Sequence, residues 1–249
     1  MSVRRFMAAC LLVMGCGASA VQASVVIGGT RVIYPSNEKE VTVPLENQGK
    51  QPVLVQVWVD TGDPLETPDA IKSPFFIRPP MFRMEPGSGH AARLTYTGDP
   101  LPDNQETMYW LNVLEVPPKA ANAAGSNHVQ FAVRTRIKLI FRPSGLQGNA
   151  TEAFKQLRWK WVTGEGGKGF ALEVTNPTPY YVNFADVGLK VDGVLKRNDD
   201  GGMVAPGATT TFSLAPLKLT SRPSGDVRAS FEVIDDSGGS SAQEAPLVP

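Results

Sequence analysis

The side chains best suited to catalysis are few in this chain of 249 residues and lie far apart in the sequence. His90 and His128 are the two histidines, and neither has another His or a Cys at metal-ligand spacing. Residues 164–169 (G-E-G-G-K-G) lack the spacing of a phosphate loop, and a turn between two strands is the better interpretation. Residues 198–202 lack the alternating ligands and closing Glu of a calcium loop. We therefore expect no enzyme activity, no metal site and no cofactor.

Two cations interrupt apolar strands and are the more informative charged residues. Arg31 lies in the apolar run of residues 29–35, and Lys138 lies in the longest alternating run of the chain. A cation among apolar neighbours is costly unless it meets a partner or emerges into solvent. From the residues alone, either each side chain emerges on a solvated face, or the two converge on one anion such as a terminal carboxylate.

The longest alternating run covers residues 127–143 and predicts a half-buried strand. Val129, Phe131 and Val133 alternate with polar or small residues, and Arg134 and Arg136 occupy the other parity, where solvent alone could satisfy them. At ~3.3 Å per residue, residues 129–141 would span roughly 40 Å if extended. A long apolar strand edge invites pairing with another chain, which natural proteins normally suppress. Strand pairing is therefore a predicted function.

The elements that must position these residues are short β-rich runs separated by Pro, Gly and Asn. Seven runs precede Pro143 and predict an immunoglobulin-like sandwich, and five follow it, so a second β domain is expected. We place the domain boundary at Pro143, giving residues 24–143 and 144–249, and expect a helical turn at 151–157 and a frayed tail at 237–249. The predicted strands are residues 25–34, 40–45, 53–59, 75–77, 91–96, 108–116, 129–141, 157–162, 170–176, 180–189, 209–214 and 227–235.

The first 23 residues have the pattern of a cleaved secretory signal: Arg4-Arg5, an apolar run and small residues up to Ala23. A lipoprotein box ending at Cys16 is the alternative. Both cysteines of the chain precede residue 24, so cleavage after Ala23 would leave no disulfide. The remaining chain would carry 22 basic and 24 acidic side chains, and this balance argues against nucleic-acid binding. No later apolar run reaches the ~18 residues that span a bilayer, so we expect no membrane insertion.

Six motifs in order resemble those of the periplasmic pilus (fimbrial) assembly chaperones of the chaperone–usher pathway. The resemblance covers both halves of the chain and implies two immunoglobulin-like domains arranged in an L with a cleft between them. It also implies a periplasmic protein that binds pilus subunits and delivers them to an outer-membrane usher without ATP. The motifs are T-R-V-I-Y-P (30–35), P-P-M-F-R (79–83), W-L-N-V (110–113), V-P-P (116–118), R-I-K-L-I-F-R-P (136–143) and N-P-T-P-Y-Y (176–181).

The resemblance assigns roles to eight side chains. The family lends its last long strand of the first domain to a subunit, so Val129, Phe131 and Val133 would be the apolar side chains that fill the subunit's groove. Arg31 and Lys138 match the two cations that hold the subunit's C-terminal carboxylate. The interdomain salt bridge matches Glu106, Arg142 and Asp236, although Asp235 could replace Asp236 and the usual aromatic that follows is here Ser237. The short loop at 119–127 resembles the family branch that serves rod-like pili.

Two other classes of protein were weighed against this interpretation. A structural or adhesive pilus subunit would be expected to carry a free alternating N-terminal extension and often a disulfide, whereas here the first strand runs directly into Arg31. A secreted β-sandwich enzyme would need a titratable cluster in a cleft, which two isolated histidines do not supply. The sequence therefore favours the chaperone.

Overall fold

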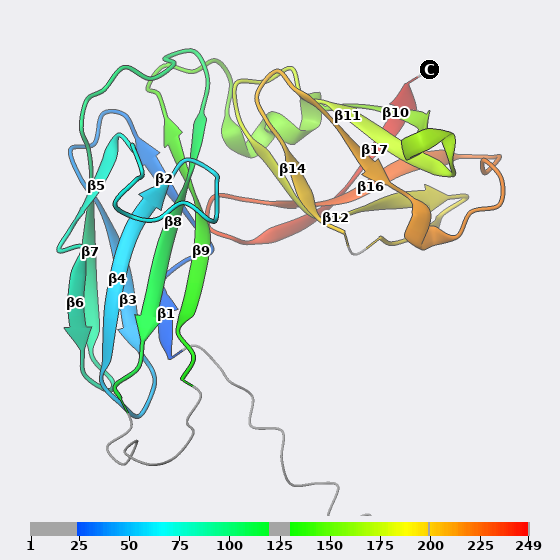
Figure 1. The fold of residues 1–249 in the computed structure, drawn as a ribbon. Helices are drawn as coiled ribbons and strands as arrows, with labels where there is room; N and C mark the ends of the chain where they lie inside the picture. The colour runs from blue at the N-terminus through cyan, green and yellow to red at the C-terminus, as the bar shows by residue number, and fades with distance from the viewer. Residues whose placement is uncertain (1–23, 120–129, 199, 249) are drawn as a thin grey trace, which may run out of the picture.

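Strands dominate the part of the chain that the computed structural model describes, residues 24–119, 130–198 and 200–248. They form two domains that meet at one end and together make an L (Figure 1). The prediction of an all-β chain with two domains is confirmed. The predicted signal and Cys16 lie outside the described residues, as do Val129, His128 and most of the loop at 119–127.

The N-terminal domain is a sandwich of two sheets, with strand orders β1-β3-β7-β5 and β2-β9-β8-β4-β6. Alternation determines which side chains enter its core, as in β4, where Val53, Val55, Val57 and Val59 are buried and the residues between them are more exposed. Each fully buried apolar side chain of this kind contributes about 1.5–3 kcal/mol. The strands are β1 Val25–Ile27, β2 Arg31–Pro35, β3 Val41–Asn47, β4 Val53–Asp60, β5 Phe75–Arg78, β6 Met81–Met84, β7 Gly89–Tyr96, β8 Thr107–Val116 and β9 Val133–Arg142.

The C-terminal domain has its own core around Trp159, which contacts the rings of Phe184 and Phe231. Its strands follow the order β13-β12-β16-β17-β10-β11-β15, and β14 pairs with β12. The elements are η1 Ala150–Gln156, β10 Arg158–Thr163, η2 Glu165–Gly167, β11 Phe170–Thr175, β12 Val182–Val191, β13 Val194–Lys196, β14 Gly202–Val204, β15 Thr209–Ser213, η3 Ala215–Leu217, β16 Val227–Ile234 and β17 Ser240–Val248. The turn predicted at residues 164–169 is confirmed, since β10 and β11 pair on either side of it.

The first predicted strand, residues 25–34, is two strands that belong to different sheets. β1 pairs with β3, and β2 pairs with β9. Between them the amide of Gly28 donates to the carbonyl of Pro44 at 2.8 Å, and a Cβ added at Gly28 would lie 2.4 Å from Pro44 Cγ. Only glycine allows this close approach, and Gly28 lies where the chain passes from one sheet to the other.

The predicted frayed tail is wrong, because residues 240–248 form β17 (Figure 1). Residues 240–246 of this strand pair antiparallel with β16, and Leu247 and Val248 pair parallel with Trp159 and Lys160 of β10. Its Ser, Ala and Gln side chains have little strand preference of their own. Backbone hydrogen bonds to neighbours on both sides decide its structure, and single-sequence composition does not report them.

Candidate functional site

The free edge of β9 is the most distinctive surface of the N-terminal domain. β8 pairs with β9 over residues 133–141, whereas β2 pairs with it only at residues 138–142. Among the described residues, the stretch Val133–Ile137 therefore has a neighbouring strand on one side alone. In Figure 1 this edge faces the angle between the two domains. An open edge of this kind presents unpaired N–H and C=O groups that another strand can pair with.

β9 is shorter than the predicted strand, because residues 130–132 are not in a strand. Strand β8 ends at Val116, and the two prolines that follow have no N–H to donate to a ladder. Phe131 has 64% of its surface exposed, and Val133 is half-buried beside Glu115. Phe131 and Val133 share the parity of the buried Leu139, so they continue the apolar row of β9 beyond the end of the core.

Asp60 anchors the middle of β9 to β4 through a network that we call the Asp60 network: Asp60, Asn112, Arg134 and Arg136. The Asp60 side chain is fully buried. Arg136 donates to both of its oxygens, at 3.0 Å from Nε and 2.5 Å from Nη2, and Arg134 Nη2 lies 3.3 Å from Oδ2. Asn112 bridges Asp60 and Arg134, because its Nδ2 donates to Asp60 at 2.8 Å and its Oδ1 accepts from Arg134 at 2.8 Å.

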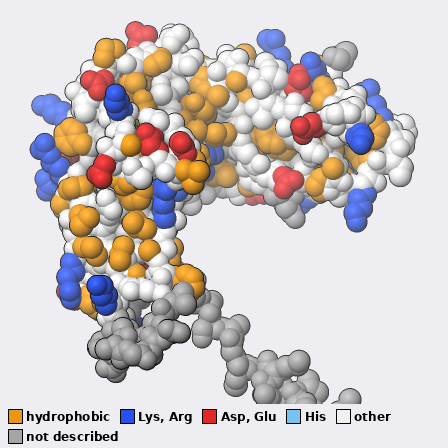
Figure 2. Space-filling view, in the orientation of Figure 1, with side chains coloured by type: hydrophobic (Ala, Val, Ile, Leu, Met, Phe, Trp, Pro, Cys, Tyr) orange, Lys and Arg blue, Asp and Glu red, His pale blue; other side chains and the backbone are white. Residues whose placement is uncertain are grey.

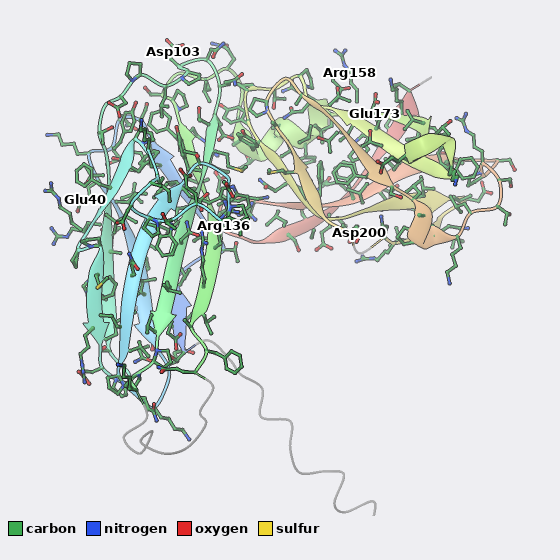
Figure 3. All side chains as sticks on the ribbon, in the orientation of Figure 1. Glu40, Asp103, Arg136, Arg158, Glu173 and Asp200 are labelled. Atoms are coloured by element: carbon green, nitrogen blue, oxygen red, sulfur yellow. The ribbon has the colours of Figure 1, made fainter. Side chains whose placement is uncertain are left out.

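Aromatic rings and one loop complete the Asp60 network. The guanidinium of Arg134 lies 4.8 Å above Trp58, and that of Arg136 lies 4.3 Å above Trp110. Arg134 also donates to the carbonyl of Pro64 at 2.6 Å, so it holds the loop between β4 and β5, beside which Arg136 appears in Figure 3. Burial opposes ionisation of Asp60, but hydrogen bonds from Arg136, Asn112 and Gly62 outweigh it and lower its pKa. Arg134 and Arg136, to which the sequence assigned no role, are therefore held by protein acceptors and not by solvent alone.

Arg31 and Lys138 are directly opposite each other in the parallel pairing of β2 and β9. Both reach the C-terminal domain, where Arg31 Nη1 lies 3.4 Å from the carbonyl of Ile234 and Lys138 Nζ donates to Asn183 Oδ1. Arg31 Nε is buried, and no described residue accepts a hydrogen bond from it. Burial and the Arg31 charge lower the pKa of Lys138 to about 8, and burial lowers that of Arg31 despite the charges of Asp236 and Asp235.

The two cations thus form a site that is suited to an anion. Two positive charges side by side repel each other, and each neutral carbonyl or amide oxygen compensates only part of one charge. A carboxylate has two oxygens that guanidinium and ammonium groups can share. A cavity of about 190 Å³ in the C-terminal domain adjoins this point, since Asn183 and Ile234 are among its lining residues.

Glu106, Arg142 and Asp236 meet at the domain junction. Arg142 Nε donates to Glu106 at 2.6 Å, and its two terminal nitrogens donate to Asp236 at 2.7 and 3.0 Å. Glu106 also accepts from the amide of Tyr181 at 2.6 Å, so it contacts both domains. Asp235 instead accepts from the amides of Ser237 and Gly239 within its own turn. Between the two alternative acids, the geometry therefore favours Asp236.

Burial and hydrogen bonding shift the pKa values of Glu106 and Arg142 at this junction. Glu106 has only 1% of its surface exposed, and burial raises its pKa despite the opposing charge of Arg142. Burial also acts against the charge of Arg142, but hydrogen bonds to Asp236 and Glu106 outweigh it and raise the Arg142 pKa. Because the Arg142 guanidinium binds two carboxylates that come from different domains, it fixes the orientation of the domains more firmly than an exposed ion pair could.

Sequence reasoning missed Asp60, Asn112, Asn183 and Glu115. A signal existed for the first two, because consecutive same-face cations at 134 and 136 require acceptors on the neighbouring strands. No pattern in the sequence singled out Asn183 or Glu115, which contact Lys138 and Ser24. Of the described histidines, His90 stacks on Phe82 and burial lowers its pKa.

Metal binding and membrane insertion would each need a structural feature of another kind. Within residues 24–119, 130–198 and 200–248, no group of three or more His, Cys, Asp or Glu side chains is placed to hold a metal ion. The same ranges contain no helix with the length and apolar character needed to cross a membrane.

Family models match both halves of the chain. Residues 24–147 match "Pili and flagellar-assembly chaperone, PapD N-terminal domain", and residues 152–245 match "Pili assembly chaperone PapD, C-terminal domain". A probable fimbrial chaperone of Escherichia coli, YadV, is 43% identical over 246 residues, which are 96% of each chain.

Solved structures agree with these sequence matches. The Pseudomonas aeruginosa CupB2 chaperone superposes with a TM-score of 0.75 at 36% identity, over 90% of this chain and all of that one. A chain of the Salmonella enterica SafA pilin–SafB chaperone complex superposes with a TM-score of 0.73 at 31% identity, over 91% and 97% of the two chains. The prediction of two immunoglobulin-like domains is therefore confirmed.

Proposed function

Because the chain belongs to the family of pili and flagellar-assembly chaperones, we propose that the free edge of β9 binds pilus subunits by strand donation. The observation that carries this proposal is the one-sided pairing of Val133–Ile137. Strand addition to an open edge is an established binding mode of pilus chaperones, in which main-chain hydrogen bonds give affinity and alternate side chains give specificity. Val129, Phe131 and Val133 are the side chains that enter the subunit's groove.

Arg31 and Lys138 supply the second contact, with the subunit's C-terminal carboxylate. The proposal rests on two adjacent, half-buried cations, one with a buried unpartnered nitrogen. A carboxylate would satisfy that nitrogen and offset the repulsion between the cations. Glu106, Arg142 and Asp236 hold the two domains in the orientation that keeps this site accessible from β9.

The pathway follows from the family. Its members are periplasmic chaperones that bind pilus subunits and pass them to an outer-membrane usher, and they are not enzymes. Our finer proposals are that residues 1–23 are a signal peptide cleaved after Ala23, that the domains are residues 24–143 and 144–249, and that hand-over needs no ATP. The assignment to the rod-like branch depends on a loop outside the described residues and stays a prediction.

Co-purification of a cognate pilus subunit from periplasm tests the proposal. Phe131→Asp places a charge in an apolar groove and should abolish capture, and Arg31→Ala and Lys138→Ala should each reduce it at least tenfold, the loss of one charged contact of ~1.5–3 kcal/mol. Arg158→Ala is the matched control, since Arg158 is exposed on β10 and lies well away from β9 in Figure 3.

The outcomes separate the two contacts. Full capture by Phe131→Asp would contradict strand donation in this register. Full capture by both cation variants would contradict the carboxylate contact while leaving strand donation intact. Equal loss in Arg158→Ala would show that the assay reports general damage to the protein.

A further inference from the structure

Glu115 is a buried carboxylate whose hydrogen bonds converge on the start of the described chain. It has 9% of its surface exposed and lies near the end of β8, opposite Val133 of β9. Its Oε2 accepts from the amides of Ser24 and Val25 at 2.8 and 2.9 Å, and its Oε1 accepts from the Ser24 hydroxyl at 2.5 Å. Both Glu115 oxygens thus accept hydrogen bonds, and all of these come from the consecutive residues Ser24 and Val25.

Ser24 is held in place from several sides. Its carbonyl accepts from the amide of Gln48 at 2.8 Å, and a Cβ added at Gly49 would lie 2.5 Å from Ser24 Cβ. β1 starts at the next residue and pairs with β3 of one sheet, whereas Glu115 belongs to the other sheet. The Ser24–Glu115 contact therefore joins the two sheets at the end of the sandwich from which residues 130–132 extend.

The charge of Glu115 is not balanced by these donors. In the part of the chain that the structure describes, its hydrogen-bond donors are two amides and one hydroxyl, all neutral. A buried carboxylate is stabilised far more by a cation than by neutral donors. Glu46 at the end of β3 and Lys50 in the following turn are both exposed to solvent. β4 and β9 place the apolar residues Val55 and Val133 opposite Glu115.

We propose that Glu115 is the binding site for the α-ammonium group that signal cleavage after Ala23 creates on Ser24. This inference rests on the exported chaperone proposed above. Cleavage turns the Ser24 amide, already 2.8 Å from Glu115, into a cation at the same place. The ion pair then completes the contact between the two sheets, so the mature chain is more stable than one that keeps residues before Ser24.

The sign of the pH dependence follows from the pair. An unperturbed α-amino group titrates at about 7.7–8.0, and an adjacent carboxylate raises that value by about one to three units. A pKa raised in the folded state gives stability that is complete below about pH 8 and is lost as the pH rises through the folded pKa. In a chain that keeps Ala23 the Ser24 nitrogen is an uncharged amide that does not titrate, so its contact with Glu115 adds no such pH dependence.

The experiment compares the protein exported to the periplasm with a chain that retains Ala23. N-terminal sequencing identifies the first residue, pH-dependent acylation read by mass spectrometry gives the α-amino pKa, and urea midpoints are measured from pH 6 to 10. We expect Ser24 as the first residue, an α-amino pKa above about 9 that returns to about 8 in Glu115→Gln, and a higher midpoint than the Ala23 chain at pH 7.

Three results would each overturn the inference: a different first residue, an α-amino pKa of about 8 in the exported protein, or equal urea midpoints at pH 7. Subunit capture by both chains is measured in parallel. Failure of capture with the predicted pKa shift would contradict the proposed function alone. Normal capture with an unshifted pKa would contradict only the role of Glu115.

Discussion

Replacing Lys138 by Arg should change how subunit binding depends on pH while preserving the charge at that position. The lysine pKa is lowered to about 8 by burial and by the Arg31 charge, so the free protein loses this charge within an accessible pH range. Arginine stays protonated throughout that range. Comparing wild type with Lys138→Arg therefore isolates the titration of Lys138.

The magnitude follows from the Lys138 pKa. A bound carboxylate raises that pKa, so binding takes up a proton, and affinity is complete below about pH 8 and falls as the pH rises. Between pH 7 and 9 the protonated fraction of free Lys138 drops from about nine-tenths to about one-tenth, which predicts a roughly tenfold loss of affinity. Titration of groups on the subunit contributes equally with both proteins and cancels in the comparison.

The assay is equilibrium binding of a cognate subunit at pH 7, 8 and 9, at constant ionic strength, to wild type and Lys138→Arg. Between pH 7 and 9 we expect the affinity of wild type to fall by an additional factor of about ten relative to Lys138→Arg. Parallel declines would refute the reasoning, because they would show that Lys138 keeps one protonation state or does not contact the subunit. Arg158→Lys, an exposed change on β10, controls for the altered composition.

Three further changes test other parts of the site. Asp60→Asn should cost about 3–5 kcal/mol of unfolding free energy in urea, because two arginines lose a buried counter-charge; a cost below about 1 kcal/mol would contradict the importance of the Asp60 network. The lowered Asp60 pKa predicts that this contribution persists above about pH 4 and is lost as the pH falls further. Phe131→Ala should leave the thermal midpoint unchanged, since the ring is 64% exposed, yet weaken subunit capture; a lower midpoint would place Phe131 in the core. Arg142→Ala should broaden the distance distribution measured by small-angle scattering, and an unchanged distribution would mean that other contacts orient the domains.

Alternation and motif order were enough to predict the architecture. The valines of β4 and the apolar row of β9 have the period of two that indicates a half-buried strand, and the number and spacing of such runs predicted a sandwich. The pairing of Arg31 with Lys138 came from the family resemblance, and the structure places them opposite each other. Their register could not be predicted from the residues, because 107 positions separate them and no local pattern links β2 with β9.

The parts that could not be predicted depend on partners far away in the chain. Nothing near Ser240 indicates that β10, some 80 residues earlier, supplies a second neighbour for β17. Two cations at 134 and 136 indicate that acceptors are needed, but they do not indicate that Asp60, more than 70 residues earlier, supplies one. Figure 2 shows hydrophobic side chains gathered on the lower part of the N-terminal domain. The exposed apolar residues of this domain include Leu54 on β4 and Met81 on β6. They had no distinguishing pattern in the sequence.

The fixed and free ends of β9 have a mechanical consequence. The strand is held at its base by Arg142 and midway by the Asp60 network, and among the described residues its pairing with β8 ends at Val133. Residues 138–142 therefore lie between two strands, whereas Val133–Ile137 are supported by β8 alone. A strand that pairs with this open edge can leave it without breaking any pairing between β8 and β9, so hand-over need not disturb the sheet that supports β9.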